Sequence, residues 1–233
     1  MLQPQRRDRD IMIQKRIGYL VCDEGDKSFP NYKWEPGTTH EADNPNYIHF
    51  AYKDLAVATM VQPALESIAN PRYWEVELGD PSHEDPFRIG AARCTAIKRH
   101  EPPEPSDMQR FNFAALMCLN YMKNENFMKW AVSYIDGTDR TPETADALSE
   151  KFRLNMCMDL EPNQAYLSAA HPLSQAVVTG NFRLFCANSA HRIIWDSPPG
   201  LNVQLFANFA MSASDAEVTG LVKSMEGGAK GPV

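Results

Sequence analysis

Three prolines within the segment Glu101-Pro102-Pro103-Glu104-Pro105 constrain the fold more than any other feature of the sequence. Proline lacks the backbone N–H that a helix interior or a central strand requires, so neither element continues through this segment. We therefore predict a Pro-rich linker over residues 101–105. It would separate a domain at 13–100 from a second domain at 106–226.

The sequence before the prolines predicts a strand-rich domain. Residues 17–22 form a short apolar run that ends in the turn-forming Asp23-Glu24-Gly25-Asp26, which is typical of a strand. Residues 72–78 alternate large apolar and acidic side chains, as a half-buried strand does. Further strands are expected at 32–35, 47–51 and 88–97, and a helix at 54–69.

The sequence after the prolines predicts helices, so the expected fold class is α+β. Ser106 and Gln109 have the spacing of a capping box, in which each side chain satisfies a free backbone donor at the helix start. Thr141-Pro142 is a second helix start. Three apolar stripes at helical spacing follow these signals: Phe111, Ala114, Ala115, Cys118, Leu119, Met122; Phe127, Trp130, Ala131, Tyr134, Ile135; and Ala145, Leu148, Phe152, Met156.

The last third of the sequence predicts shorter helices. Helices at 164–170 and 173–178 are expected to be broken by Pro172 and Gly180, and another helix is expected at 182–195. Leu201, Leu205 and Phe209 repeat every four residues and predict one buried face. Residues 214–217 would cap a final helix that ends near Met225.

The two ends of the sequence differ from its body. Residues 1–12 form a basic tip, interpreted as a flexible tail or as a contact for nucleic acid or an acidic partner, and residues 227–233 are expected to be a flexible tail. The tip lacks the apolar core of a secretory signal. Five cysteines without a C-x-x-C pair favour reduced thiols in a cytoplasm, and no His/Cys spacing predicts a metal site.

Charge and hydropathy exclude several classes of protein. The formal net charge of −7 argues against nucleic-acid binding by the whole surface. No apolar run reaches the roughly 18 residues of a membrane span. We therefore expect a cytoplasmic protein that does not enter a membrane.

Glu75 and Glu77 are the sharpest chemical signal. Two residues apart on a strand, their side chains point to the same face, where repulsion can raise one pKa while the other carboxyl stays ionised. Such a pair can divide acid and base roles. The alternative is that both acids are the solvated face of an amphipathic strand.

The order of elements around these glutamates resembles ADP-ribosyltransferases. The residues that carry the resemblance are Arg16 before the first strand, the aromatic segment 47–52 before a helix, and the Glu-x-Glu strand. The resemblance covers residues 13–80 and implies NAD as cofactor. It implies that Arg16, His49 and Tyr52 contact the nicotinamide dinucleotide, that Glu77 orients the ribose and stabilises an oxocarbenium-like transition state, and that Glu75 assists.

A second resemblance lies in the helical part. The segments 113–119, 127–131 and 137–141 resemble uncharacterised bacteriophage and prophage proteins that join a strand-rich N-terminal part to a helical tail. This resemblance covers residues 45–150 and implies a phage origin without an established activity.

Two hypotheses about function follow. The first is a phage-encoded, non-enzymatic interaction protein that binds a host or virion protein in the host cytoplasm, since no complete catalytic motif is present and aromatic and Met-rich helices suit protein partners. The second is an ADP-ribosyltransferase-like enzyme that uses NAD, with Glu77 as the key acid.

Overall fold

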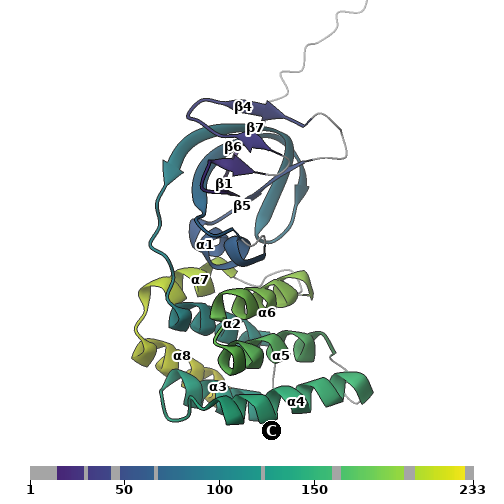
Figure 1. Cartoon of the computed structure of the whole chain (residues 1–233), viewed down its shortest axis with the longest axis vertical. Helices are drawn as coiled ribbons and strands as arrows, with labels where there is room; N and C mark the ends of the chain where they lie inside the picture. Colours follow the sequence, from purple (N-terminus) through teal and green to yellow (C-terminus); the bar gives the residue numbers. More distant parts are fainter. Residues whose placement is uncertain are drawn as a thin grey trace, which may run out of the picture.

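The computed structural model describes residues 15–28, 31–42, 48–65, 68–121, 124–158, 164–196 and 203–228. A strand-rich region comes first in the chain and a helical region follows, with helix α1 between them in space (Figure 1). The predicted α+β class is therefore confirmed. The predicted basic tip lies outside the described residues, as do residues 229–233 of the predicted tail.

The main sheet closes on itself. Its strands are β1 (Arg16–Cys22), β4 (Thr39–Glu41), β5 (His49–Tyr52), β6 (Arg72–Glu84) and β7 (Arg88–His100), in the order β4-β7-β5-β1-β6. Because β6 also pairs with β7, the strands β1, β5, β7 and β6 form a ring, and β4 pairs with the same edge of β7 as β5, beyond the end of β5. Two short strands, β2 (Lys27–Ser28) and β3 (Tyr32–Lys33), pair separately.

Two glycines allow the strands of the ring to approach closely. A Cβ atom on Gly18 would lie 2.8 Å from the Cβ of Ala51, and one on Gly90 would lie 2.6 Å from Cδ1 of Ile48. Both distances are shorter than van der Waals contact, so a larger residue would push β5 away from its neighbours. The ring encloses a small apolar core, made up of Leu20, Cys22, Trp34, Ala51, Trp74, Val76, Leu78, Ile89, Ala91, Cys94 and Ala96.

Helix α1 (Leu55–Leu65) joins the two regions. Asp54 caps its start, because its Oδ1 accepts hydrogen bonds from the backbone N–H groups of Ala56 (2.8 Å) and Val57 (3.2 Å). The helix packs between the outer face of the ring and the helices α6 and α7 (Figure 1).

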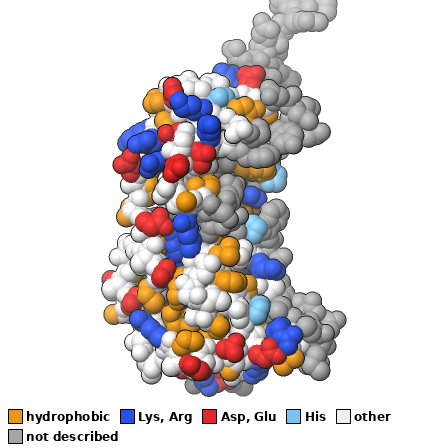
Figure 2. Space-filling view, viewed as in Figure 1, with side chains coloured by type: hydrophobic (Ala, Val, Ile, Leu, Met, Phe, Trp, Pro, Cys, Tyr) orange, Lys and Arg blue, Asp and Glu red, His pale blue; other side chains and the backbone are white. Residues whose placement is uncertain are grey.

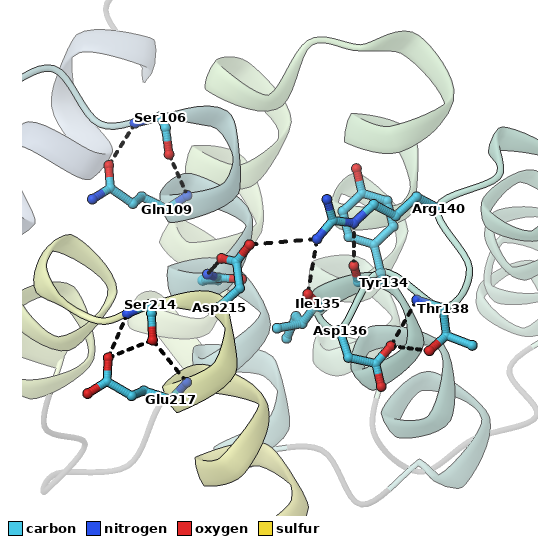
Figure 3. A network of polar contacts seen from close by, with 11 residues as sticks. Ser106, Gln109, Tyr134, Ile135, Asp136, Thr138, Arg140, Ser214, Asp215 and Glu217 are labelled. Carbon is cyan, nitrogen blue, oxygen red and sulfur yellow. Dashed lines mark hydrogen bonds and ion pairs between the residues drawn. The ribbon is translucent and has the colours of Figure 1, made fainter.

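The helical region contains α2 (Asp107–Tyr121), α3 (Glu125–Ile135), α4 (Pro142–Met158), α5 (Gln164–Thr179), α6 (Phe182–Asp196), α7 (Val203–Ser212) and α8 (Asp215–Gly228). The predicted capping box is present: the backbone N–H of Ser106 donates to Gln109 Oε1 (2.8 Å), and that of Gln109 donates to Ser106 Oγ (3.2 Å) (Figure 3). Ser214 and Glu217 cap α8 in the same way.

One buried cluster runs through both regions. It extends from α2 and its neighbouring helices through Val57 and Val61 of α1 to Val21, Tyr52 and Tyr73 of the sheet. The change of secondary structure at the prolines is therefore not a gap in the hydrophobic core.

Two predictions about the helices were wrong. Pro172 does not break α5, which runs from Gln164 to Thr179 as one helix. Pro172 is buried, and burial of Ala169, Leu173 and Ala176 on either side offsets the lost backbone hydrogen bond.

The face of α7 was also mispredicted. Its buried residues are Val203, Phe206, Ala207 and Ala210, whereas Leu205 is 58% exposed. Spacings of three and four residues, rather than a strict four, keep one face of a helix against the core.

Within the described residues, no helix is long and apolar enough to cross a bilayer. Cys22, Cys94, Cys118 and Cys186 are buried and form no disulfide, which agrees with the expected absence of disulfides for these four thiols.

Candidate functional site

The register of the ring decides which of the predicted NAD-site residues share a face. Tyr19 lies directly opposite both Tyr52 and Glu75, and Ile17 lies opposite Glu77. Directly opposed residues of antiparallel strands project to the same side. Glu75, Glu77 and Tyr52 therefore lie on the outer face of the ring, although Tyr52 is only 3% exposed.

Arg16 and His49 lie on the opposite side of their strands. Each is three residues away from the outward-facing Tyr19 or Tyr52, and side chains alternate along a strand. His49 is buried beside the rings of Trp34 and Tyr32, and burial, followed by the charge of His40, lowers its pKa. The exposed Arg16 lies 3.8 Å from Glu84. The structure thus brings Glu75, Glu77 and Tyr52 to one face and places Arg16 and His49 on the other.

Both glutamates have cationic or ionisable neighbours. Oε2 of Glu75 lies 2.8 Å from Nε2 of His100, and Oε1 of Glu77 lies 3.1 Å from Nζ of Lys15. Burial, and then the charge of Glu75, raises the pKa of Tyr19. Such contacts are typical of a solvated strand face that carries ion pairs. The sequence pattern did not indicate His100 as a partner of Glu75.

A groove between α3 and α4 is one concavity of the described part of the structure. It has a volume of about 410 Å³. Its floor is apolar and includes Trp130 and Leu148, which are 6% and 9% exposed. Polar side chains and one alanine form the walls: Asn126, Lys129, Ser133, Asp139, Thr144, Ala147 and Lys151.

Helical spacing places these residues. The lining positions are 126, 129, 130 and 133 on α3 and 144, 147, 148 and 151 on α4, so each helix contributes one stripe at i, i+3, i+4 and i+7. Because α3 ends where α4 begins, after the loop 136–141, Asn126 and Lys151 lie at one end of the groove. Ser133 and Thr144 lie at the other.

The two ends of the groove carry opposite charge. Lys151 is exposed and makes no ion pair with a described residue, while Lys129 is 2.6 Å from Glu125. Asp139 lies at the loop end, also without an ion-pair partner in the described part of the chain. The backbone N–H of Thr141, with the hydroxyls of Thr141 and Thr144, lowers the pKa of the Asp139 carboxyl.

Arg140 holds the loop end of the groove in place. Its Nε and Nη2 atoms donate to the carbonyl oxygens of Tyr134 (2.8 Å) and Ile135 (3.0 Å), which satisfies the last turn of α3 (Figure 3). Nη2 also lies 3.7 Å from Asp215 at the start of α8. Arg140 therefore links the end of α3 to the start of α8.

Sequence reasoning missed the groove. The two helices and their buried stripes were predicted, but the polar stripes beside them looked like ordinary solvated faces. The polar positions that repeat at helical spacing on both helices could have indicated the groove. Only the packing of the helices shows that the two polar stripes face each other.

The described residues contain no group of three or more His, Cys, Asp or Glu side chains that could hold a metal ion. Comparison with known proteins gives no further guide to chemistry, because no protein-family model, curated protein or solved structure matches the chain significantly.

Proposed function

We propose that this protein acts without catalysis and binds another protein through the groove between α3 and α4. The observation that carries the proposal is the composition of the groove: an apolar floor of Trp130 and Leu148 between walls in which Lys151 and Asp139 make no ion pair with a described residue. Protein interfaces combine a buried aromatic anchor with a polar rim, and tryptophan is enriched among the residues that dominate binding energy.

Two further observations support a binding role. The indole N–H of Trp130 is buried without an acceptor among the described residues, which is costly for a residue that only fills a core. Elsewhere, acidic and basic side chains are interspersed on the strand-rich region, with no face of one sign in the view shown (Figure 2). The resemblance to phage proteins suggests a host or virion protein as the partner.

The test is a comparison of two tryptophan substitutions. Ala147 is exposed in the wall of the groove, so Ala147→Trp would fill it, whereas Ala216→Trp adds the same side chain to an exposed position at the start of α8. Both variants and the wild type would be used as bait in lysate with quantitative mass spectrometry. We expect a partner that is retained by the wild type and Ala216→Trp and lost with Ala147→Trp. Equal retention by all three baits would refute the groove as the binding site.

The ADP-ribosyltransferase-like function is the second candidate, because Glu75, Glu77 and Tyr52 share the outer face of the ring. The separation of Arg16 and His49 from that face disfavours it. We expect NAD at millimolar concentration to leave the thermal midpoint unchanged. Binding would be visible in this experiment, because a ligand at 100 times its Kd adds about 2.7 kcal/mol of stability. A rise of several degrees that Glu77→Gln abolishes would instead support the enzyme.

A further inference from the structure

The charges of the groove are arranged along its length. Thr144 and Lys151 are seven residues apart on α4, so the loop end and the lysine end are separated by about 10 Å along the helix axis. Lys151 lies at one end and Asp139 at the other, and the apolar side chains lie between them, with Lys129 beside Trp130. A ligand that fits has an apolar middle and opposite charges at its two ends.

An amphipathic helix has this pattern. Helices favour acidic side chains in the first turn and basic side chains in the last turn, because these charges oppose the helix macrodipole. An apolar stripe at i, i+3, i+4 and i+7 would cover Trp130, Ala147 and Leu148. Full side-chain charges outweigh the half charges of the helix termini, so the side chains set the direction of the bound helix.

Resting on the proposed function, we infer that the partner segment is an amphipathic helix bound antiparallel to α4, with an acidic first turn at Lys151 and a basic last turn at Asp139. The charges nearby agree with this orientation. Glu125 offsets Lys129 and Glu150 pairs with Arg153, so Lys151 is the charge at its end of the groove that has no ion-pair partner among the described residues. Asp136, by contrast, lies 3.7 Å from Lys223, which leaves Asp139 as the acid of the loop without an ion-pair partner in the described part of the chain.

Two synthetic peptides of the same composition test the direction. Both carry a leucine stripe at helical spacing over about four turns. The forward peptide has Glu in its first turn and Lys in its last, and the reversed peptide has these charges exchanged. Because the reversed peptide is intrinsically less helical, each peptide is compared across protein variants by fluorescence anisotropy, rather than with the other peptide.

The matched variants are Lys151→Glu in the groove and Lys98→Glu on β7, an exposed lysine of the sheet that makes no ion pair with a described residue. We expect Lys151→Glu to weaken forward-peptide binding about 3- to 10-fold, because an exposed attraction becomes a repulsion. It should leave reversed-peptide binding unchanged or stronger. Lys98→Glu should change neither, and Ala147→Trp should abolish binding of the forward peptide.

Equal effects of Lys151→Glu and Lys98→Glu, or no binding of the forward peptide at 1 mM, would overturn the inferred helix. The proposed function is tested separately, by the capture of a partner with Ala147→Trp as bait. If a natural partner is lost with Ala147→Trp while the forward peptide does not bind, the groove is a binding site for a segment of another kind. If partner capture is insensitive to Ala147→Trp, the groove is not the binding site.

Discussion

The strand-rich and helical regions are stabilised in different ways. In the sheet, the ring depends on residues far apart in sequence, such as Gly18 beside Ala51 and Trp74, whose indole N–H donates to Asp26 (2.9 Å). In the helical region, several helix starts are fixed locally, as Ser106 and Gln109 show at α2. The helices are therefore specified mainly by residues within their own segments, whereas the ring forms only when strands that are distant in sequence pair with one another.

The two regions nevertheless share one buried cluster through α1. The shared cluster raises the question of whether the two regions unfold together. Substitutions in each region can answer it, and Phe111→Ala is expected to change the free energy of unfolding the most.

Phe111→Ala should destabilise the whole protein. Phe111 is fully buried in α2 and contacts the rings of Trp130 (5.7 Å) and Tyr134 (4.2 Å between centroids). We expect a loss of about 3–5 kcal/mol, the usual effect of removing a buried phenylalanine. Urea unfolding would be followed by circular dichroism at 222 nm for the helices and by hydrogen exchange of β1 and β6 for the sheet.

A continuous core predicts that both signals shift to lower urea together. Unchanged protection of β1 and β6 in Phe111→Ala would show that the strand-rich region is independently stable. That result would support the prediction from the sequence of two domains at 13–100 and 106–226.

Glu104→Ala should break the polar link between the linker and the helices. Arg110 is 97% buried, pairs with Glu104 and lies 3.5 Å from the carbonyl oxygen of Met60 in α1. Removing Glu104 leaves a buried guanidinium without its carboxylate, and we expect a loss of about 2–4 kcal/mol.

The control for this change is in the same linker. Glu101 is exposed and pairs with the exposed Arg99, so Glu101→Ala should cost under about 0.5 kcal/mol. Both variants would be measured by urea denaturation. Similar losses for the two variants would mean that the link from Glu104 to Arg110 has no special role in joining the regions.

Asp26→Ala should destabilise the protein by weakening the sheet. Asp26 has φ of 59°, accepts the indole hydrogen bond of Trp74 and accepts the backbone N–H of Trp34 through its carbonyl oxygen (2.9 Å). Alanine removes the acceptor of a part-buried donor and is strained at this φ, so we expect a loss of about 1–3 kcal/mol.

Asp26→Asn is the matched change, because asparagine tolerates positive φ and keeps an acceptor oxygen. It should cost less than Asp26→Ala in the same urea experiment. The idea that the indole hydrogen bond stabilises the ring is wrong if the two substitutions have equal effects.

Stability should fall gradually in mild acid, and in both regions. Burial lowers the pKa of His49 in the ring, of His171 in α5 and of His191 in α6 from the ordinary value of 6.5. The unfolded chain therefore binds more protons than the folded chain below that value. The stabilising contribution is present above pH 6.5 and is lost as the pH falls through the lowered folded-state pKa values.

Urea midpoints at about pH 7.5 and about pH 5 would measure this effect. His171→Gln should reduce the pH dependence, because His171 is the histidine bonded to the buried Ser149 (2.7 Å between Nδ1 and Oγ). A midpoint that does not change with pH, or that rises in acid, would contradict the prediction.

Most of the secondary structure could be predicted from local signals. The capping box at Ser106, the glycine stop at Gly137 (φ 81°) and the start at Pro142 act within one helical turn, so their effects do not depend on the rest of the fold. Pro172 was mispredicted because burial in the packed helices outweighed a local preference.

The candidate sites were less predictable. The common face of Glu75 and Glu77 follows from the period of a strand, and it was predicted. The separation of Arg16 and His49 from that face depends on the register between β1, β5 and β6, which sequence spacing does not contain.

The sequence by itself determined that strands precede helices, where most helices begin, and which side of α3 and α4 is apolar, because these depend on backbone chemistry and on periods of two and 3.6 residues. Only the tertiary structure decided that β6 closes the ring by pairing with β7, that α1 joins two regions into one core, and that the polar stripes of α3 and α4 face each other across a groove. Each of these features depends on contacts between residues distant in sequence, whose free energy appears only after the chain has packed.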